Sequence, residues 1–182
     1  MHYIERDNAI QSAIRIGRPM FNKTHPDYAG MQVLNTILGG YFGSRLMKNI
    51  REDKGFTYGI GSAAVSLLNE GYFFIASEVG AEVCEEALVE VYKEMEILCR
   101  EPVPDEELQM VKNYMLGSFL KSIDGAFNLA DRWKGIMFYN LGYDYYNRFI
   151  NTVSAISSAE VMMLAQKYLS REDMCELVVG KK

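Results

Sequence analysis

The feature that most constrains the fold of this chain is a pair of strand-like segments joined by a short turn. Residues 56–66 and residues 72–79 are interpreted as strands, and the connection between them contains Asn69 and Gly71. Asn and Gly favour the tight turns that join the two strands of a hairpin. We therefore expect these two segments to pair as an antiparallel hairpin.

Segments with helical periodicity lie on either side of this hairpin. A helix is predicted to begin near Thr24, where Thr24 and Asp27 have the spacing of a capping box, and to end at Gly39-Gly40. Ser44 is predicted to cap a short second helix that runs to about residue 52, before Gly55. The strongest amphipathic pattern covers residues 81–99, with Cys84, Leu88, Val91, Tyr92, Met95 and Leu98 on its apolar face.

The remaining segments complete the predicted order of elements. Alternation over residues 11–17 indicates a strand that Arg18 and Pro19 end, and residues 175–179 form a short apolar strand. Further helices are expected at residues 105–123, at 125–140, and from a cap at Ser157 and Ser158 to residue 169. This order predicts an α+β domain, a two-layer sandwich of a mainly antiparallel sheet with helices on one face.

Composition excludes several classes of function. The 182 residues carry 19 Lys or Arg and 24 Asp or Glu, a net charge of −5 with a pI near 5.2, so the basic surface of a nucleic-acid-binding protein is missing. No apolar run approaches the roughly 20 residues of a membrane span, and residues 1–10 lack the apolar core of a secretory signal. Cys84, Cys99 and Cys175 have no C-x-x-C spacing, which favours free thiols in a reducing compartment such as the cytoplasm.

Residues that could carry chemistry are few. His2 and His25 are the two histidines, 23 positions apart, so the clustered ligands of a zinc site are not predicted. Residues 59–64 match a loose G-x-G-x-x-A pattern, but an alternating strand follows where a dinucleotide fold needs a helix. The stripe Arg45, Lys48, Arg51 and Lys54 is either an anion site or a solvated helical face, and a solvated face is the usual explanation.

Two further clusters are interpreted as structural. Tyr139, Tyr143, Tyr145 and Tyr146 are expected to be core or interface residues with hydrogen-bonded tips. Gly39, Gly40 and Gly43 are interpreted as a turn that lets two helices pack closely.

One joined segment resembles a known family. The stretch 34–40, followed by Ser44-Arg45-Leu46, Ile50-Arg51-Glu52 and Gly55-Phe56-Thr57-Tyr58, is similar to the carboxy-terminal domain of the insulinase or pitrilysin family of zinc metallopeptidases. The flanks agree with it: residues 11–17, then 24–28, and the closing strand at 177–180. The likeness covers nearly the whole chain and implies a LuxS- and mitochondrial-processing-peptidase-like metallohydrolase fold.

The resemblance also implies how such a chain works. In the family two homologous domains form a half, and two halves close around an unfolded peptide. The zinc motif His-x-x-Glu-His of the family is absent from this sequence, so the chain resembles a non-catalytic domain. We expect residues 1–182 to be one peptidase domain of a longer chain, inactive alone, with zinc in an amino-terminal partner domain or partner subunit, as a dimer or pseudo-dimer.

The resemblance assigns roles to Arg51 and Tyr58. The family carries an Arg and a Tyr seven positions apart that reach the substrate near the scissile bond, and Arg51 and Tyr58 have that spacing. A guanidinium and a phenol can both donate to a substrate carbonyl or to the oxyanion formed during hydrolysis. The alternative is structural, with Arg51 paired to Glu52 or Asp53 and Tyr58 packed. A rival function is a non-catalytic scaffold subunit of the same fold.

Overall fold

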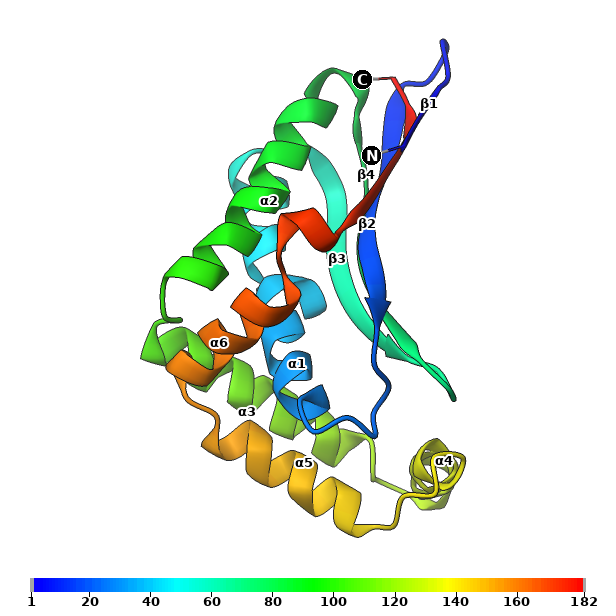
Figure 1. Cartoon of the computed structure of the whole chain (residues 1–182), viewed down its shortest axis with the longest axis vertical. Coiled ribbons are helices and arrows are strands. Elements are labelled where there is room, and N and C mark those ends of the chain that lie inside the picture. The colour runs from blue at the N-terminus through cyan, green and yellow to red at the C-terminus, as the bar shows by residue number, and fades with distance from the viewer. Residues whose placement is uncertain (1, 182) are drawn as a thin grey trace.

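The computed structural model describes residues 2–181, in which a sheet and a helical layer pack together (Figure 1). The sheet has the strand order β1-β5-β2-β4-β3. Among the described strands only β1 and β5 pair in parallel, and the other neighbours are antiparallel. The predicted α+β class, with a mainly antiparallel sheet and helices on one face, is confirmed. The strands are β1 (His2–Glu5), β2 (Gln11–Met20), β3 (Thr57–Ser66), β4 (Gly71–Gly80) and β5 (Cys175–Gly180).

The predicted hairpin is confirmed as β3 and β4, and the amide of Leu67 donates to the carbonyl of Glu70 across its turn. The predicted end of β2 at Arg18 and Pro19 is wrong, because the strand continues to Met20. Pro19 pairs with Tyr72 of β4, whereas the pairing of β2 with β5 stops at Gly17. Pro19 therefore lies where one side of β2 has no neighbouring strand, so its missing N–H disturbs no ladder.

The helical layer consists of α1 to α6 and two π-helical turns. The π-helical turns η1 (Thr36–Gly40) and η2 (Met47–Asp53) lie between α1 and β3. The α-helices are α1 (Tyr28–Asn35), α2 (Cys84–Arg100), α3 (Asp105–Lys121), α4 (Ala126–Met137), α5 (Asp144–Ala155) and α6 (Ser158–Tyr168). Short 3₁₀ turns, η3 (Ala81–Val83) and η4 (Arg171–Asp173), precede α2 and β5.

The predicted caps have different outcomes. Ser157 caps α6, as expected, and with Glu160 it forms a complete capping box, whereas Ser158 is the first residue of the helix. The box predicted at Thr24 and Asp27 is wrong, because the Thr24 hydroxyl donates to Asn22 Oδ1 and α1 begins only at Tyr28. The cap predicted at Ser44 is also wrong. Within residues 2–181 its buried hydroxyl has no hydrogen-bond partner.

The core lies between the sheet and the helices. The apolar face predicted for residues 81–99 is buried throughout, and so are the apolar residues of the helical segments before β3: Met31, Leu34, Ile37, Leu38, Leu46, Met47 and Ile50. They pack against inward strand residues such as Ile16, Phe73 and Ile75 in one cluster. Burial of this apolar surface is the main stabilising contribution to the fold.

The other face of the sheet is uncovered in the described part of the chain, because the helices lie on the opposite side (Figure 1). Along β4 the residues Tyr72, Phe74, Ala76 and Glu78 alternate with buried neighbours. Glu78 forms an ion pair with Arg15 of β2 at 2.7 Å. We call the outward residues of β2, β4 and β5 the open sheet face: Ala13, Arg15, Gly17, Tyr72, Phe74, Ala76, Glu78, Leu177 and Val179.

Candidate functional site

Arg51 lies on the second π-helical turn, η2, and its side chain reaches the first residues of β3. Its Nε donates to the carbonyl oxygen of Tyr58 at 2.9 Å. Its guanidinium carbon lies 4.9 Å from the centre of the Phe42 ring, a cation–π distance. Nη1 is 4.0 Å from Glu52 Oε1, which is longer than a hydrogen bond. One edge and one face of the guanidinium are thus held, while the side chain remains about one third exposed.

Tyr58 lies on a β-bulge at the start of β3. The pairing with β4 passes from Thr57 opposite Val79 to Ile60 opposite Ser77, so Tyr58 and Gly59 together lie opposite Glu78. Such an extra residue re-aims the side chains beside it. Tyr58 is 92% exposed, and its ring is available to a ligand rather than packed in the core.

The structure therefore brings together the two residues that the sequence singled out, through a contact of the Arg51 side chain with the Tyr58 backbone. The structural alternative is wrong for Tyr58, whose ring does not pack. For Arg51 the Glu52 contact is long, and the Tyr58 carbonyl and the Phe42 ring are its closer partners. Phe42 was missed by the sequence analysis. An aromatic residue inside a glycine-rich turn is the sequence signal that could have identified Phe42 as a site residue. In the structure Phe42 is 64% exposed.

The stripe of basic residues does not form one site. Arg45 donates from Nε and Nη2 to both carboxylate oxygens of Glu107, at 2.9 and 2.7 Å, with its side chain only 15% exposed. This buried fork contradicts the expectation of a solvated face at Arg45. Lys54 pairs with Glu90 at 3.4 Å, whereas Arg51 contacts the carbonyl of Tyr58.

The glycine-rich turn supports β3 directly. A Cβ on Gly39 would lie 2.7 Å from the amide nitrogen of Ser62 on β3 and 3.0 Å from Leu46 Cδ1. The expectation that the turn serves the packing of two helices is therefore incomplete, because the close approach is chiefly between η1 and a strand. Residues 59–64 lie in β3, which confirms that the G-x-G-x-x-A pattern belongs to a strand.

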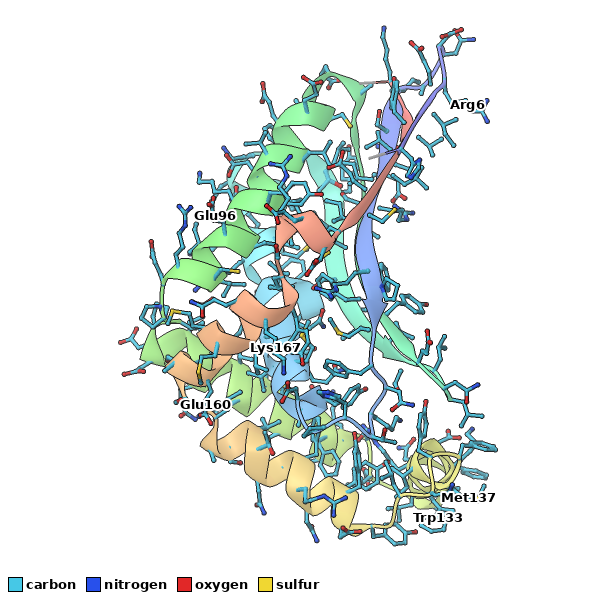
Figure 2. All side chains as sticks on the ribbon, in the orientation of Figure 1. Arg6, Glu96, Trp133, Met137, Glu160 and Lys167 are labelled. Atoms are coloured by element: carbon cyan, nitrogen blue, oxygen red, sulfur yellow. The ribbon has the colours of Figure 1, made fainter. Side chains whose placement is uncertain are left out.

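The expectation for the tyrosine cluster holds for Tyr139 and Tyr146, whose hydroxyl groups form hydrogen bonds. Tyr146 Oη donates to the carbonyl of Arg132 at 2.6 Å, and Tyr139 Oη is 3.0 Å from Ser66 Oγ. Burial raises the pKa of Tyr145 well above its usual value. Tyr143 is more exposed and stacks on Trp133 of α4, which Figure 2 labels at the lower end of the molecule.

The described residues do not fit a zinc ion. Within residues 2–181 there is no group of three or more His, Cys, Asp and Glu side chains that could hold a metal. His25 stacks on Phe21 with ring centres 4.0 Å apart, and its Nδ1 accepts the amide of Asp27. No helix within the same residues has the length and hydropathy needed to cross a bilayer.

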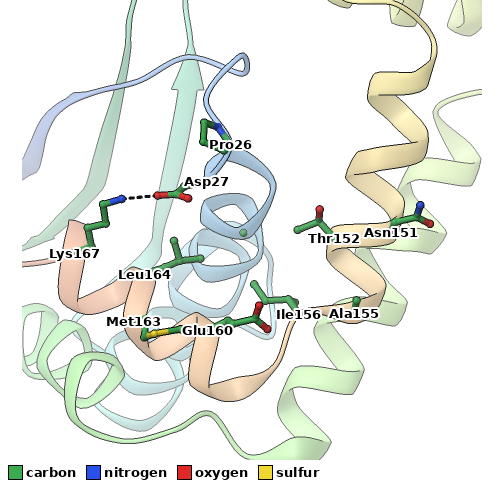
Figure 3. Close-up of a pocket in the computed structure, with 11 residues that line it drawn as sticks. Pro26, Asp27, Asn151, Thr152, Ala155, Ile156, Glu160, Met163, Leu164 and Lys167 are labelled. Carbon is green, nitrogen blue, oxygen red and sulfur yellow. Dashed lines mark hydrogen bonds and ion pairs between the residues drawn. The ribbon is translucent and has the colours of Figure 1, made fainter.

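A cavity of about 650 Å³ lies between α1, α5 and α6 (Figure 3). Its apolar wall includes Ile156 and Leu164. At its margin Lys167 Nζ donates to Asp27 Oδ2 at 2.8 Å, and Tyr168 Oη donates to the same oxygen at 2.6 Å. These two bonds hold the pKa of Asp27 below its usual value, and they tie the start of α1 to the end of α6.

Because the folded pKa of Asp27 is lowered, its bonds stabilise the fold above the unfolded pKa of about 3.9 and are lost as pH falls through the folded value. We expect Asp27→Asn to lose about 1 kcal/mol of unfolding free energy at pH 7, and much less at pH 3. Urea unfolding at both pH values measures this. Asp131→Asn, whose exposed carboxylate pairs with Lys134, should change little. An equal loss at both pH values would contradict this role of Asp27.

Comparison with known proteins supplies the context for this geometry. A family model described as the peptidase M16 inactive domain matches residues 2–115. An uncharacterized zinc protease of Bacillus subtilis, YmxG, is 28% identical over 147 residues, which cover 80% of this chain and 36% of that protein. A probable inactive metalloprotease of the same organism, YmfF, is 24% identical over 129 residues, 70% of this chain and 30% of that protein.

Solved structures agree with the sequence relatives. A peptidase M16 inactive domain from Pseudomonas fluorescens matches with a TM-score of 0.90 and 27% identity, over 100% of this chain and 43% of that chain. A chain of complex III from Candida albicans, at 15% identity, has a TM-score of 0.78 over 98% of this chain and 45% of that chain, and it shows the fold alone. The chain thus spans about a third of its curated relatives and less than half of these solved chains.

Proposed function

The chain belongs to the family of peptidase M16 inactive domains, and from this membership we propose that it is the substrate-binding and catalysis-supporting domain of a zinc-dependent metalloendopeptidase. The family match confirms the resemblance drawn from the sequence. The observation that carries the proposal is the arrangement at Arg51, whose guanidinium is held at Nε beside an exposed Tyr58. This arrangement leaves two donor groups available to a peptide.

Each of the two residues has a defined task in this proposal. The guanidinium is permanently charged, and its terminal nitrogens can donate to a substrate carbonyl or to the oxyanion that develops from it. The Tyr58 hydroxyl adds a neutral donor. Because both are positioned before the substrate arrives, little reorganisation is needed when the charge forms. The substrate would be an unfolded peptide held in a closed chamber.

The metal chemistry in this proposal belongs to another domain or subunit. The described residues do not fit zinc, so a metal ion that activates water for hydrolysis would be held by an amino-terminal domain or partner subunit, in a dimer or pseudo-dimer. The share of the relatives that this chain covers supports a companion of comparable size. The open sheet face, with Phe74 and Leu177 uncovered, is an apolar surface of the kind that a companion domain covers.

The rival function is a non-catalytic scaffold subunit. Two comparisons support this rival function. The fold is similar to that of a chain of complex III, and one relative is described as a probable inactive metalloprotease. In that case Arg51 and Tyr58 would serve structure alone. The two functions differ in what the full-length protein should do with metal and peptide.

The test measures zinc content and cleavage of an unstructured peptide by the full-length protein that contains this chain. We expect about one zinc per active unit and cleavage that a chelator abolishes and added zinc restores. Residues 1–182 alone should cleave nothing. A full-length protein that is folded and assembled but has neither zinc nor cleavage would overturn the proposal in favour of the scaffold.

A further inference from the structure

The β-bulge that carries Tyr58 creates a local problem of hydrogen bonding. Tyr58 and Gly59 lie opposite Glu78 alone, so the backbone groups of the extra residue have no partner in the ladder. Tyr58 and Gly59 are exposed, so water can pair with these backbone groups, but only a partner within the protein holds them in one orientation. Gly59 offers no side chain of its own for this purpose.

Two hydroxyl groups satisfy these backbone groups. Thr57 Oγ1 donates to the carbonyl of Glu78 at 2.6 Å and accepts the amide of Gly59 at 3.1 Å. Ser77 Oγ, on β4, donates to the carbonyl of Gly59 at 3.0 Å. Each hydroxyl has one proton to donate, and this assignment uses each proton once. We call these contacts of Thr57 and Ser77 the bulge network.

The bulge network determines where the site residues lie. It fixes Gly59 on both of its backbone groups, and therefore fixes the peptide unit that joins Tyr58 to Gly59. The carbonyl of that unit is the one that accepts Arg51 Nε at 2.9 Å. The orientation of the Tyr58 ring and the edge contact of Arg51 thus depend on the same short piece of backbone.

We propose that Thr57 and Ser77 are positioning residues of the Arg51–Tyr58 site, acting through the bulge network and not by contact with substrate. This inference rests on the proposed function and adds to it the residues that orient its donors. Ser77 is 2% exposed, so it is unavailable to a peptide. The chemical requirement at both positions is a hydroxyl of short reach, because the acceptors are backbone carbonyls.

The test compares Thr57→Val, which removes the hydroxyl and keeps the shape, with Thr57→Ser, which keeps the hydroxyl. Both are made in the full-length protein. Thr57→Val should lower the turnover number for an unstructured peptide about tenfold or more, since small misplacements near a reacting bond are costly, with KM changed less than about twofold. Thr57→Ser should restore most of the turnover. Hydrogen exchange of the Gly59 amide should quicken by about fivefold or more in Thr57→Val and should stay near wild type in Thr57→Ser.

The matched control is Ser62→Ala on the same strand. Its buried hydroxyl donates to Asn35 Oδ1 at 2.8 Å and takes no part in the bulge network, so turnover and Gly59 exchange should stay near wild type even though stability falls. Ser77→Ala should resemble Thr57→Val.

The outcomes separate this inference from the proposed function. If Arg51→Ala abolishes cleavage while Thr57→Val and Ser77→Ala leave turnover unchanged, the positioning role is wrong and the proposed function stands. If Arg51→Ala has no effect on cleavage, both proposals are overturned. Slower turnover in Thr57→Val with unchanged Gly59 exchange would also reject the bulge network as the cause.

Discussion

Replacing Arg51 by alanine in the full-length protein is expected to lower the turnover number for an unstructured peptide by about 100-fold or more. A donor aimed at a developing oxyanion contributes roughly 3 kcal/mol to lowering the barrier. KM should change little, because the contact gains most of its strength in the transition state. Steady-state kinetics at several peptide concentrations, with zinc content measured on the same samples, gives both quantities.

Arg100→Ala is the control for charge removal. Arg100 ends α2, is largely exposed, and pairs with Glu96 one turn earlier, so turnover should remain within about twofold of wild type, as for most surface substitutions. If Arg51→Ala lost zinc along with activity, the lower turnover would reflect a defect in assembly and not the loss of a catalytic contact. Unchanged turnover at full zinc content would reject a catalytic contribution from Arg51.

The largest effect on stability is expected for Phe73→Ala. Phe73 lies on β4, faces the helices and is fully buried. Removing its ring leaves a cavity in a close-packed core, which costs about 3–5 kcal/mol. Because a typical unfolding free energy is about 5–15 kcal/mol, the Phe73→Ala variant should be only marginally stable. Urea unfolding followed by circular dichroism measures the loss.

Phe74→Ala supplies a control on the adjacent residue of the same strand. Phe74 belongs to the open sheet face and is half-buried. Phe74→Ala in the chain 1–182 should therefore lower the unfolding free energy by on the order of 1 kcal/mol. In the full-length protein the loss should be greater, because a companion domain on the open sheet face would bury the ring. Equal losses in the two proteins would contradict that part of the proposed function.

Much of the fold follows from local patterns in the sequence. The apolar faces of α1 and α2 are predictable because each arises from one periodicity over many residues, and the β3–β4 hairpin is predictable from the Asn and Gly of its turn. Strand β1 is not, since all four of its residues are exposed and its pairing with β5 joins opposite ends of the sequence. Helix α5 was also missed, although its sequence is amphipathic and its one fully buried residue is Val153.

The candidate site was partly predictable for a different reason. The spacing of Arg51 and Tyr58 is visible in the sequence, but their contact depends on a π-helical turn and a β-bulge. The π-helical turn and the β-bulge are defined by the hydrogen-bond partners of the backbone. The periodicity of apolar side chains contains no information about those partners. Gly59 inside a strand was the available signal of a bulge, and Thr57 beside it supplied the hydroxyl.

The β-bulge also makes the site sensitive to the number of residues in β3. Carbonyls at alternate positions of this strand point away from β4, as at Ala64, which accepts Gln32 Nε2. Deleting Gly59 would restore regular alternation, keep Thr57 and Ile60 facing the helices, and turn the Tyr58 carbonyl into the ladder opposite Glu78. Arg51 would lose its acceptor although every named side chain of the core and the site remained. Insertions and deletions in residues 57–60 are therefore expected to remove the contact between Arg51 and Tyr58 while preserving the fold.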